Sequence, residues 1–152
     1  MPLNIINGDI TKVEADVIVN AANTELLEGD GVCGVIFRAA GNAKLQEACN
    51  KVAPIRTGEA VITDGFALSK HIIHTAGPVY CDGEHGEEAL LRSCYINSLN
   101  LAKAQGCQSI AFPLISSGIY GYPYDEALSV AKNAITDWLS NNDMGVSLVL
   151  YP

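Results

Sequence analysis

Six short apolar runs, separated by segments of helical periodicity, constrain the fold of this 152-residue chain more than any other feature. Each run is bounded by Gly, Pro or Asn, and its apolar character is nearly continuous. Strands that are covered on both faces have this character, whereas half-exposed strands alternate. The runs lie at residues 3–6, 17–21, 60–63, 71–75, 109–113 and 147–151. They predict a sheet that is buried between two layers.

Apolar residues recur at helical spacing between these runs. The helical stripes lie at residues 32–40, 43–52, 91–102 and 128–139. Gly41 and Gly106 are expected to end the first and third helices, and Pro123 to open the last one. Strands that alternate with helices predict an α/β fold with a mixed, mostly parallel sheet and helices on both faces. With no internal repeat and no linker, we expect one domain over residues 1–152.

The charge balance restricts the partners of the chain. Nine Lys and Arg residues against seventeen Asp and Glu residues give a net charge of −8. Binding to nucleic acid or to an anionic membrane needs a basic surface, so neither partner is expected. The negative net charge does not exclude a small anionic ligand, because backbone N–H groups and a helix N-terminus hold phosphate without any lysine.

The five cysteines are an odd number, and no two of them have C-x-x-C spacing. No signal peptide and no apolar run of transmembrane length is recognisable. Reduced thiols in a cytoplasmic protein are the simplest interpretation. Cys81, His74 and His85 are conceivable zinc ligands, but their spacing fits no structural zinc pattern. We therefore expect neither a metal nor a cofactor.

Two loops, at residues 20–37 and 113–123, follow predicted strands and lead into predicted helices. The first has the spacing G-x-G-x-x-G, but a dinucleotide-binding fold would also need an acid about twenty residues further on, and residues 50–58 contain none. The second offers the hydroxyls of Ser116 and Ser117 and the amide of Gly118 as donors. Turn geometry alone explains many such loops. Two of them at neighbouring strand ends favour a clamp around a diphosphate.

Six motifs, in this order, resemble those of the macrodomains, a family that binds ADP-ribose. The motifs are GDIT (8–11), VNAAN (19–23), GDGVCGVIFRAAG (29–41), IIHTAGP (72–78), SCYINSL (93–99) and IAFPLISSGIYGYP (110–123). The resemblance covers nearly the whole chain and implies a three-layer α/β/α fold. Its branch looks like that of the O-acetyl-ADP-ribose deacetylases and mono-ADP-ribosyl hydrolases. The implied partner is ADP-ribose or an ADP-ribosylated protein, and no oligomeric state is indicated.

The resemblance also implies a ligand site. Asp9 would accept a hydrogen bond from the adenine amino group, beside the backbone of Ile10, and Tyr151 would stack on the same ring. From the residues alone, Asp9 is as readily a turn-capping residue. Asn20 and Asn23 are the expected ligand-binding amides, with Asn23 bonded to the distal ribose near the reacting bond. The diphosphate and the distal ribose would be surrounded by Gly31, Val32, Ser116, Ser117, Gly118, Ile119 and Tyr120.

The first loop departs from that branch at three positions. Cys33 stands where the branch usually has an Asp, Phe37 where it has a His, and Asp30 where it has a Gly. Asp30 is expected to take the left-handed backbone of that glycine. The stripe expected to face the core is Val32, Val35, Ile36 and Ala39. Cys33 and Phe37, four residues apart, would then share the face that looks into the ligand groove.

Three interpretations of this exchange stay open. In the first, which we favour, the chain hydrolyses ADP-ribose esters slowly, with a water positioned by Asn23 and the substrate's own phosphate. In the second, it is a reader that binds ADP-ribose and releases it unchanged. In the third, Cys33 is a nucleophile whose pKa is lowered by the helix N-terminus. His74, on an apolar strand, is expected to be a core histidine and not a catalytic one.

Overall fold

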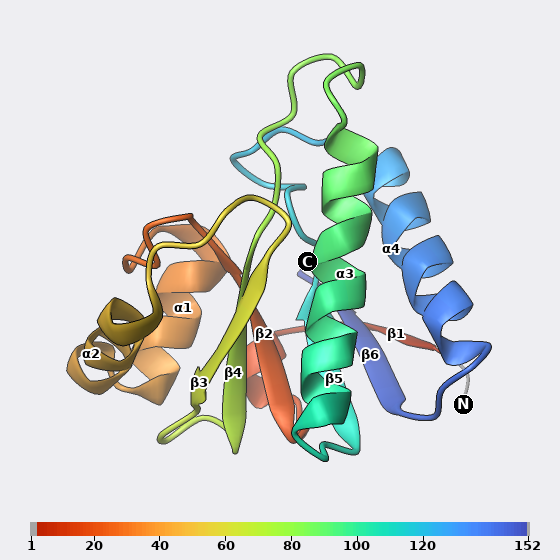
Figure 1. The fold of residues 1–152 in the computed structure, drawn as a ribbon. Coiled ribbons are helices and arrows are strands. Elements are labelled where there is room, and N and C mark those ends of the chain that lie inside the picture. Colours follow the sequence, from red (N-terminus) through yellow and green to blue (C-terminus); the bar gives the residue numbers. More distant parts are fainter. Residues whose placement is uncertain (1–2, 152) are drawn as a thin grey trace.

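The apolar runs form strands and the periodic segments form helices in a computed structural model that describes residues 3–151 (Figure 1). The strands are β1 (Asn4–Asn7), β2 (Val17–Ala22), β3 (Ala60–Asp64), β4 (His71–Ala76), β5 (Ser109–Pro113) and β6 (Gly145–Leu150). The helices are α1 (Gly31–Ala40), α2 (Asn42–Val52), α3 (Glu87–Ala104) and α4 (Tyr124–Leu139), with a short 3-10 helix η1 (Ile10–Lys12). Only the 3-10 helix has no counterpart among the predicted elements.

The six strands form one sheet in the order β1-β6-β5-β2-β4-β3. Every neighbouring pair is parallel except β3 and β4, which are antiparallel. The predicted mixed, mostly parallel sheet is therefore confirmed. The expectation that all runs are covered on both faces is wrong for β1, where Ile5 and Ile6 are exposed. This strand lies at the edge of the sheet and has β6 as its strand neighbour.

Alternate residues of the central strands enter two separate hydrophobic cores. Val17 and Val19 of β2 pack into the core that contains residues of α3 and α4. Ile18, between them, packs into the core that contains residues of α1 and α2. Because side chains of a strand point to opposite faces, a strand that feeds two cores is mostly apolar on both faces. This arrangement is the predicted α/β/α sandwich (Figure 1).

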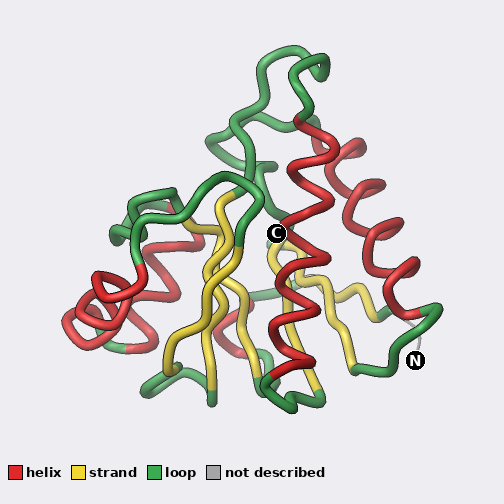
Figure 2. The backbone as a smooth tube through the Cα atoms, in the orientation of Figure 1, coloured by secondary structure: helices red, strands yellow, loops and turns green. Residues whose placement is uncertain are grey.

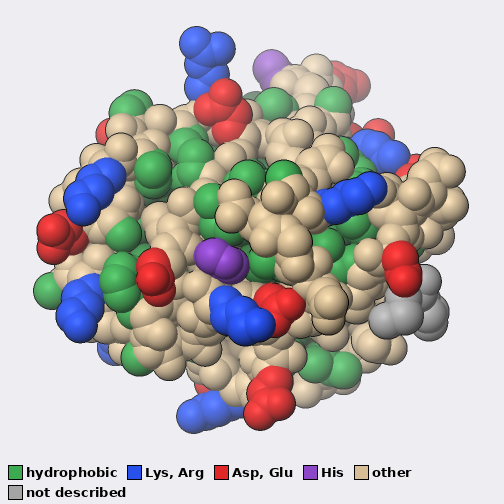
Figure 3. All heavy atoms as spheres, turned by 60° about the horizontal axis from the view of Figure 1, so that its bottom comes forward, with side chains coloured by type: hydrophobic (Ala, Val, Ile, Leu, Met, Phe, Trp, Pro, Cys, Tyr) green, Lys and Arg blue, Asp and Glu red, His purple; other side chains and the backbone are tan. Residues whose placement is uncertain are grey.

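The parallel strands bring their carboxyl ends to one edge of the sheet, where long loops gather at the upper end of Figure 2. Figure 3 brings the lower end forward and shows acidic and basic side chains interspersed there. Ligands of such sheets bind beyond the carboxyl ends of the strands, so the loop-rich end is the place to look for a site. Among the described residues, no helix has both the length and the apolar character needed to cross a membrane.

Candidate functional site

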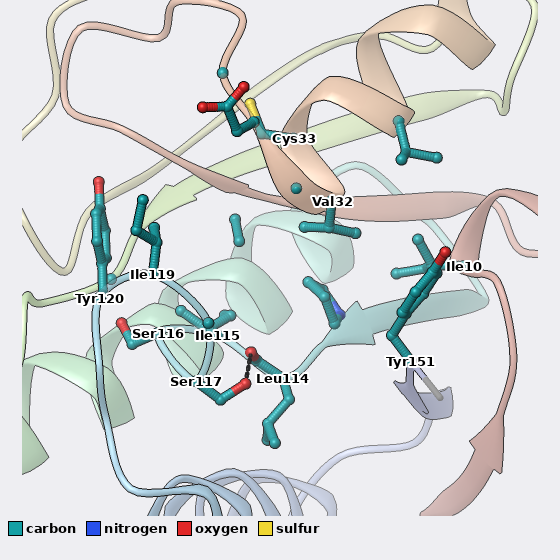
Figure 4. A pocket seen from close by; sticks show the side chains of 18 of the residues that line it. Ile10, Val32, Cys33, Leu114, Ile115, Ser116, Ser117, Ile119, Tyr120 and Tyr151 are labelled. Atoms are coloured by element: carbon teal, nitrogen blue, oxygen red, sulfur yellow. Dashed lines mark hydrogen bonds between the residues drawn. The ribbon is translucent and has the colours of Figure 1, made fainter.

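A cavity of about 690 Å³ lies at this end of the sheet, within the usual size of a small-molecule site. It is elongated: Tyr151 and Ile10 lie on one side of the view, and Tyr120 and Ile119 lie on the other (Figure 4). All of the predicted ligand-binding residues line it except Asn20 and Phe37. Lining residues that the sequence did not indicate are Gly8, Ala21, Ala22, Gly29, Asp30, Val35, Arg38, Gly77, Pro113, Leu114, Ile115, Tyr124, Val149 and Leu150.

The first loop places the N-terminus of α1 at this cavity. Asn23 closes the loop, because its side chain donates to the Leu27 carbonyl at 2.9 Å and accepts from the Leu27 N–H at 3.0 Å. The prediction that Asp30 is left-handed is wrong: its φ is −88°, and the left-handed residue is Gly31, with φ 63°. Asp30 makes no side-chain hydrogen bond to cap the helix. The first turn of α1 therefore presents N–H groups that an anion can accept.

The second loop is shaped by its own side chains. The Ser116 hydroxyl donates to the Pro78 carbonyl at 2.8 Å, and the Ser117 hydroxyl donates to the Leu114 carbonyl at 2.9 Å (Figure 4). The expectation that these hydroxyls serve a phosphate is therefore wrong for this conformation. A Cβ added to Gly118 would meet no atom within 4 Å, so its backbone borders open space. What this loop offers a ligand is main-chain N–H groups and room.

Cys33 lies on the buried side of the cavity and is only 6% exposed. Its thiol lies 3.8 Å from the Leu27 carbonyl and 3.6 Å from Nδ2 of Asn20. Burial raises the pKa of the Cys33 thiol, and the Gly29 backbone and Asn20 oppose this only in part. The expected lowering of this pKa by the helix terminus is wrong. A neutral thiol is a weak nucleophile, which disfavours covalent catalysis by Cys33.

The predicted orientation of α1 is also wrong. Phe37 is 1% exposed and lies in the core with Ile36, whereas Val32 and Val35 are half-buried and line the cavity. Cys33 therefore faces the cavity without Phe37 beside it. Apolar residues occupy both candidate faces of this helix, so periodicity alone did not decide which face is inside. Replacing a His by Phe37 thus affects packing behind the cavity and not its lining.

A buried hydrogen-bond network lies behind Cys33. Asn20 donates through Nδ2 to Nδ1 of His74 at 3.1 Å, and His74 Nε2 lies 3.0 Å from the Thr63 hydroxyl. The Thr63 hydroxyl donates to the Asp64 carbonyl, so it accepts from His74, whose Nε2 carries the proton. Burial lowers the pKa of His74 to about 4, which keeps the ring neutral. His74 lies among core residues, as predicted, and Asn20 belongs to this network and not to the cavity.

The other end of the cavity is formed by η1 and the end of β6. Asp9 caps η1: its Oδ1 accepts from the Thr11 N–H at 2.9 Å and from the Thr11 hydroxyl at 2.7 Å. These bonds lower the pKa of Asp9, so the carboxylate stays ionised. Tyr151 is 73% exposed and provides an open aromatic face at the same end. A carboxylate beside an aromatic ring suits a flat ligand with an amino group.

Comparisons with known proteins agree on one family. Residues 19–131 match the family model of the Macro domain. A Macro domain-containing protein of Chlorobaculum tepidum is 49% identical over 156 residues, which cover 99% of this chain and 90% of that protein. The O-acetyl-ADP-ribose deacetylase of Escherichia fergusonii is 48% identical over 145 residues, which cover 92% of this chain and 81% of that protein.

Solved structures give the same result. The Oceanobacillus iheyensis macrodomain with ADP superposes with a TM-score of 0.92 at 45% identity, and the match covers 98% of this chain and 82% of that one. The Trypanosoma brucei macrodomain in complex with ADP-ribose superposes with a TM-score of 0.87 at 36% identity, over 97% of this chain and 63% of that one.

Proposed function

Because the chain belongs to the Macro domain family, we propose that its cavity binds ADP-ribose, either free or attached to a protein. The observation that carries this proposal is the uncapped amino end of α1 at the cavity, together with a second loop whose serine hydroxyls are bonded within the protein. Two similar macrodomains hold ADP and ADP-ribose. A diphosphate suits such a surface, because a helix N-terminus and oriented amides stabilise anions without a cation.

The shape of the cavity supports one orientation of this ligand. The adenine would lie between Asp9 and Tyr151, and the diphosphate would pass between the first turn of α1 and the Gly118 backbone. The distal ribose would then reach Asn23 and Cys33. Asp9 accepts from the adenine amino group in this arrangement, since an ionised carboxylate has no donor to offer.

We extend the proposal to slow hydrolysis of ADP-ribose esters. A relative named O-acetyl-ADP-ribose deacetylase supports this chemistry. In the reaction, a water oxygen bonds to the ester carbonyl carbon, the bond from that carbon to the ribose oxygen breaks, and a proton passes to the ribose oxygen. Asn23 is already bonded to Leu27, so its contribution is to shape the loop, and the substrate phosphate is left to orient the water.

Calorimetry with ADP-ribose tests the binding proposal, with two variants of one glycine as probes. Gly118→Glu places a long carboxylate in the open space beside the diphosphate and should abolish the binding heat. Gly118→Ala is the matched control for folding, because the added methyl group meets no protein atom within 4 Å and should leave thermal stability unchanged. Absence of binding heat in the wild type, or normal binding by a folded Gly118→Glu, would overturn the proposal.

Turnover is tested separately, with O-acetyl-ADP-ribose and with a protein ADP-ribosylated through an ester bond. The wild type should release ADP-ribose slowly from one or both. A pure reader would show the calorimetric heat and no release from either substrate. That result would remove the enzymatic part of the proposal and keep the binding part.

A further inference from the structure

The loop between β4 and α3 brings three metal-binding side chains together outside the cavity. It contains Cys81, Asp82 and His85 and rises above the start of α3 in Figure 1. The sulfur, a carboxylate oxygen and a ring nitrogen all lie within 4.8 Å of one another, and all three residues are exposed. Of the zinc ligands considered from the sequence, Cys81 and His85 are therefore close together, whereas His74 is buried in the sheet.

The backbone of this loop is held in place by a buried carboxylate. Glu87 is 2% exposed, and its Oε2 accepts from the N–H groups of Cys81 at 2.9 Å, Asp82 at 3.1 Å and Gly83 at 3.0 Å. Its Oε1 accepts from the His85 N–H at 2.7 Å. The ligand-bearing backbone is therefore preorganised, which reduces the cost of binding.

Asp82 and His85 already lie side by side as a hydrogen-bonded pair, which a cation would have to open. Asp82 Oδ1 lies 2.7 Å from His85 Nδ1 and also accepts from the Glu84 N–H at 2.8 Å, which fixes the carboxylate. Zinc lies about 2.0–2.3 Å from each of its ligand atoms. The three ligand atoms lie within 4.8 Å of one another, so the exposed side chains must move toward a shared ion to reach these bond lengths.

The charge of the segment favours a cation at this place. Residues 71–91 contain Asp82, Glu84, Glu87 and Glu88 and no Lys or Arg. A divalent ion would be neutralised by one thiolate and one carboxylate. Thiolate and imidazole together select zinc or cobalt over magnesium and calcium, which prefer oxygen ligands.

We propose that Cys81, Asp82 and His85 form a binding site for a divalent cation of the zinc class, with water in the fourth position. The ligands would be the Cys81 sulfur, a carboxylate oxygen of Asp82 and Nδ1 of His85. The site is distinct from the cavity, although the Tyr80 N–H donates to the Tyr120 carbonyl at 2.8 Å and so joins this loop to the cavity wall.

Cobalt titration of the reduced, chelator-treated protein tests the proposal. Cobalt bound to a thiolate gives a ligand-to-metal charge-transfer band, and tetrahedral cobalt gives intense visible bands. We expect one equivalent of cobalt to produce both and zinc to displace it. Cys81→Ser should lose the charge-transfer band, and His85→Gln should weaken cobalt binding by about tenfold or more.

Cys107→Ser and His71→Gln are matched controls, since they remove a cysteine and a histidine outside the loop and should titrate like the wild type. Circular dichroism confirms that each variant is folded. A wild type without a thiolate band, or a Cys81→Ser variant with an unchanged band, would overturn the proposal. ADP-ribose calorimetry on Cys81→Ser measures ligand binding in the cavity separately from metal binding in the loop. Failure of the metal site can therefore be distinguished from failure of ADP-ribose binding.

Discussion

At the scale of single residues, burial decides what Cys33 contributes. Its thiol pKa is raised, so at neutral pH it is neither a thiolate nor a base. We expect Cys33→Ala to leave the turnover of an ADP-ribose ester nearly unchanged. Cys33→Asp places a carboxylate at the reacting end and should raise turnover by up to about 10²-fold, since positioned acid–base groups contribute about 10²–10⁴ in rate.

Single-turnover kinetics on both variants, with calorimetric affinities for ADP-ribose measured in parallel, separate chemistry from binding. A collapse of turnover in Cys33→Ala with intact affinity would restore the nucleophile interpretation. An inert Cys33→Asp that still binds ADP-ribose would show that the missing carboxylate does not limit the rate.

Asp9 caps η1 and is proposed to accept from the adenine amino group, and one substitution distinguishes these two roles. Asp9→Asn keeps an oxygen for the Thr11 bonds and turns an NH₂ group toward the position proposed for the adenine amino group. We expect it to weaken ADP-ribose binding by about 1–3 kcal/mol, the usual cost of an unmatched buried polar group, and to leave ribose 5-phosphate binding unchanged. Calorimetry with both ligands measures this. Equal losses for the two ligands would place the adenine elsewhere.

At the scale of elements, periodicity predicted that α1 exists but not how it is rotated. Cys33, Ile36, Phe37 and Ala40 form its buried face, yet Val32, Val35 and Ala39 are equally apolar. A sequence with two apolar stripes fits either orientation, and packing against β2 and α2 decides between them. The direction of the Ser116 and Ser117 hydroxyls was unpredictable for a similar reason, since their partners lie on a loop backbone that only the fold brings near.

The end of β4 and the second loop fit together at Gly77. A Cβ there would lie 2.2 Å from Ser116 Oγ and 2.5 Å from Ile115 Cγ2, so Gly77→Ala must displace these two side chains of the second loop. We expect this variant to lose about 1–3 kcal/mol of unfolding free energy, the usual cost of overpacking. ADP-ribose affinity should fall with it. Urea denaturation and calorimetry measure the two effects, and Gly118→Ala, whose added methyl group meets no protein atom within 4 Å, is the control for stability. Unchanged affinity would show that the loop position is not critical.

At the scale of the whole molecule, pH should act through His74. The ring titrates near 6.5 when exposed in the unfolded chain and near 4 in the fold. Between these values the unfolded chain binds a proton that the folded chain does not, so stability falls as pH drops from about 6.5 to about 4. The loss is at most about 3 kcal/mol, at 1.36 kcal/mol for each pKa unit. Above this window His74 has no effect.

Urea denaturation across this pH range, on the wild type and on His74→Gln, measures the effect. The variant should lose most of the pH dependence, whereas His71→Gln, at the start of the same strand, should keep it. Glu87, whose pKa is lowered to about 2, adds a separate loss only below its ordinary value of 4.5. An unchanged slope in His74→Gln would assign the pH dependence to other groups.

The architecture as a whole was predictable because strands buried between two cores have nearly continuous apolar sequences. Val17, Ile18 and Val19 are all buried, and only a strand between two layers requires three consecutive apolar residues. The exposed strand β1 carries the similar run at residues 3–6, so composition alone did not separate an edge strand from a central one. Strand order depends on long-range pairing, which no local pattern contains.

The main-chain character of the cavity bears on how such a protein can change over time. The side chains of Asn23, Ser116 and Ser117 bond to the protein itself, which leaves backbone N–H groups to meet the ligand. Every residue except proline carries such a group, so a mutation that preserves loop shape and leaves the cavity open preserves these N–H contacts. Ligand binding and catalysis can then change independently during evolution. Under the proposed function, a substitution at position 33 would change the chemistry while the loops continue to hold the same ligand.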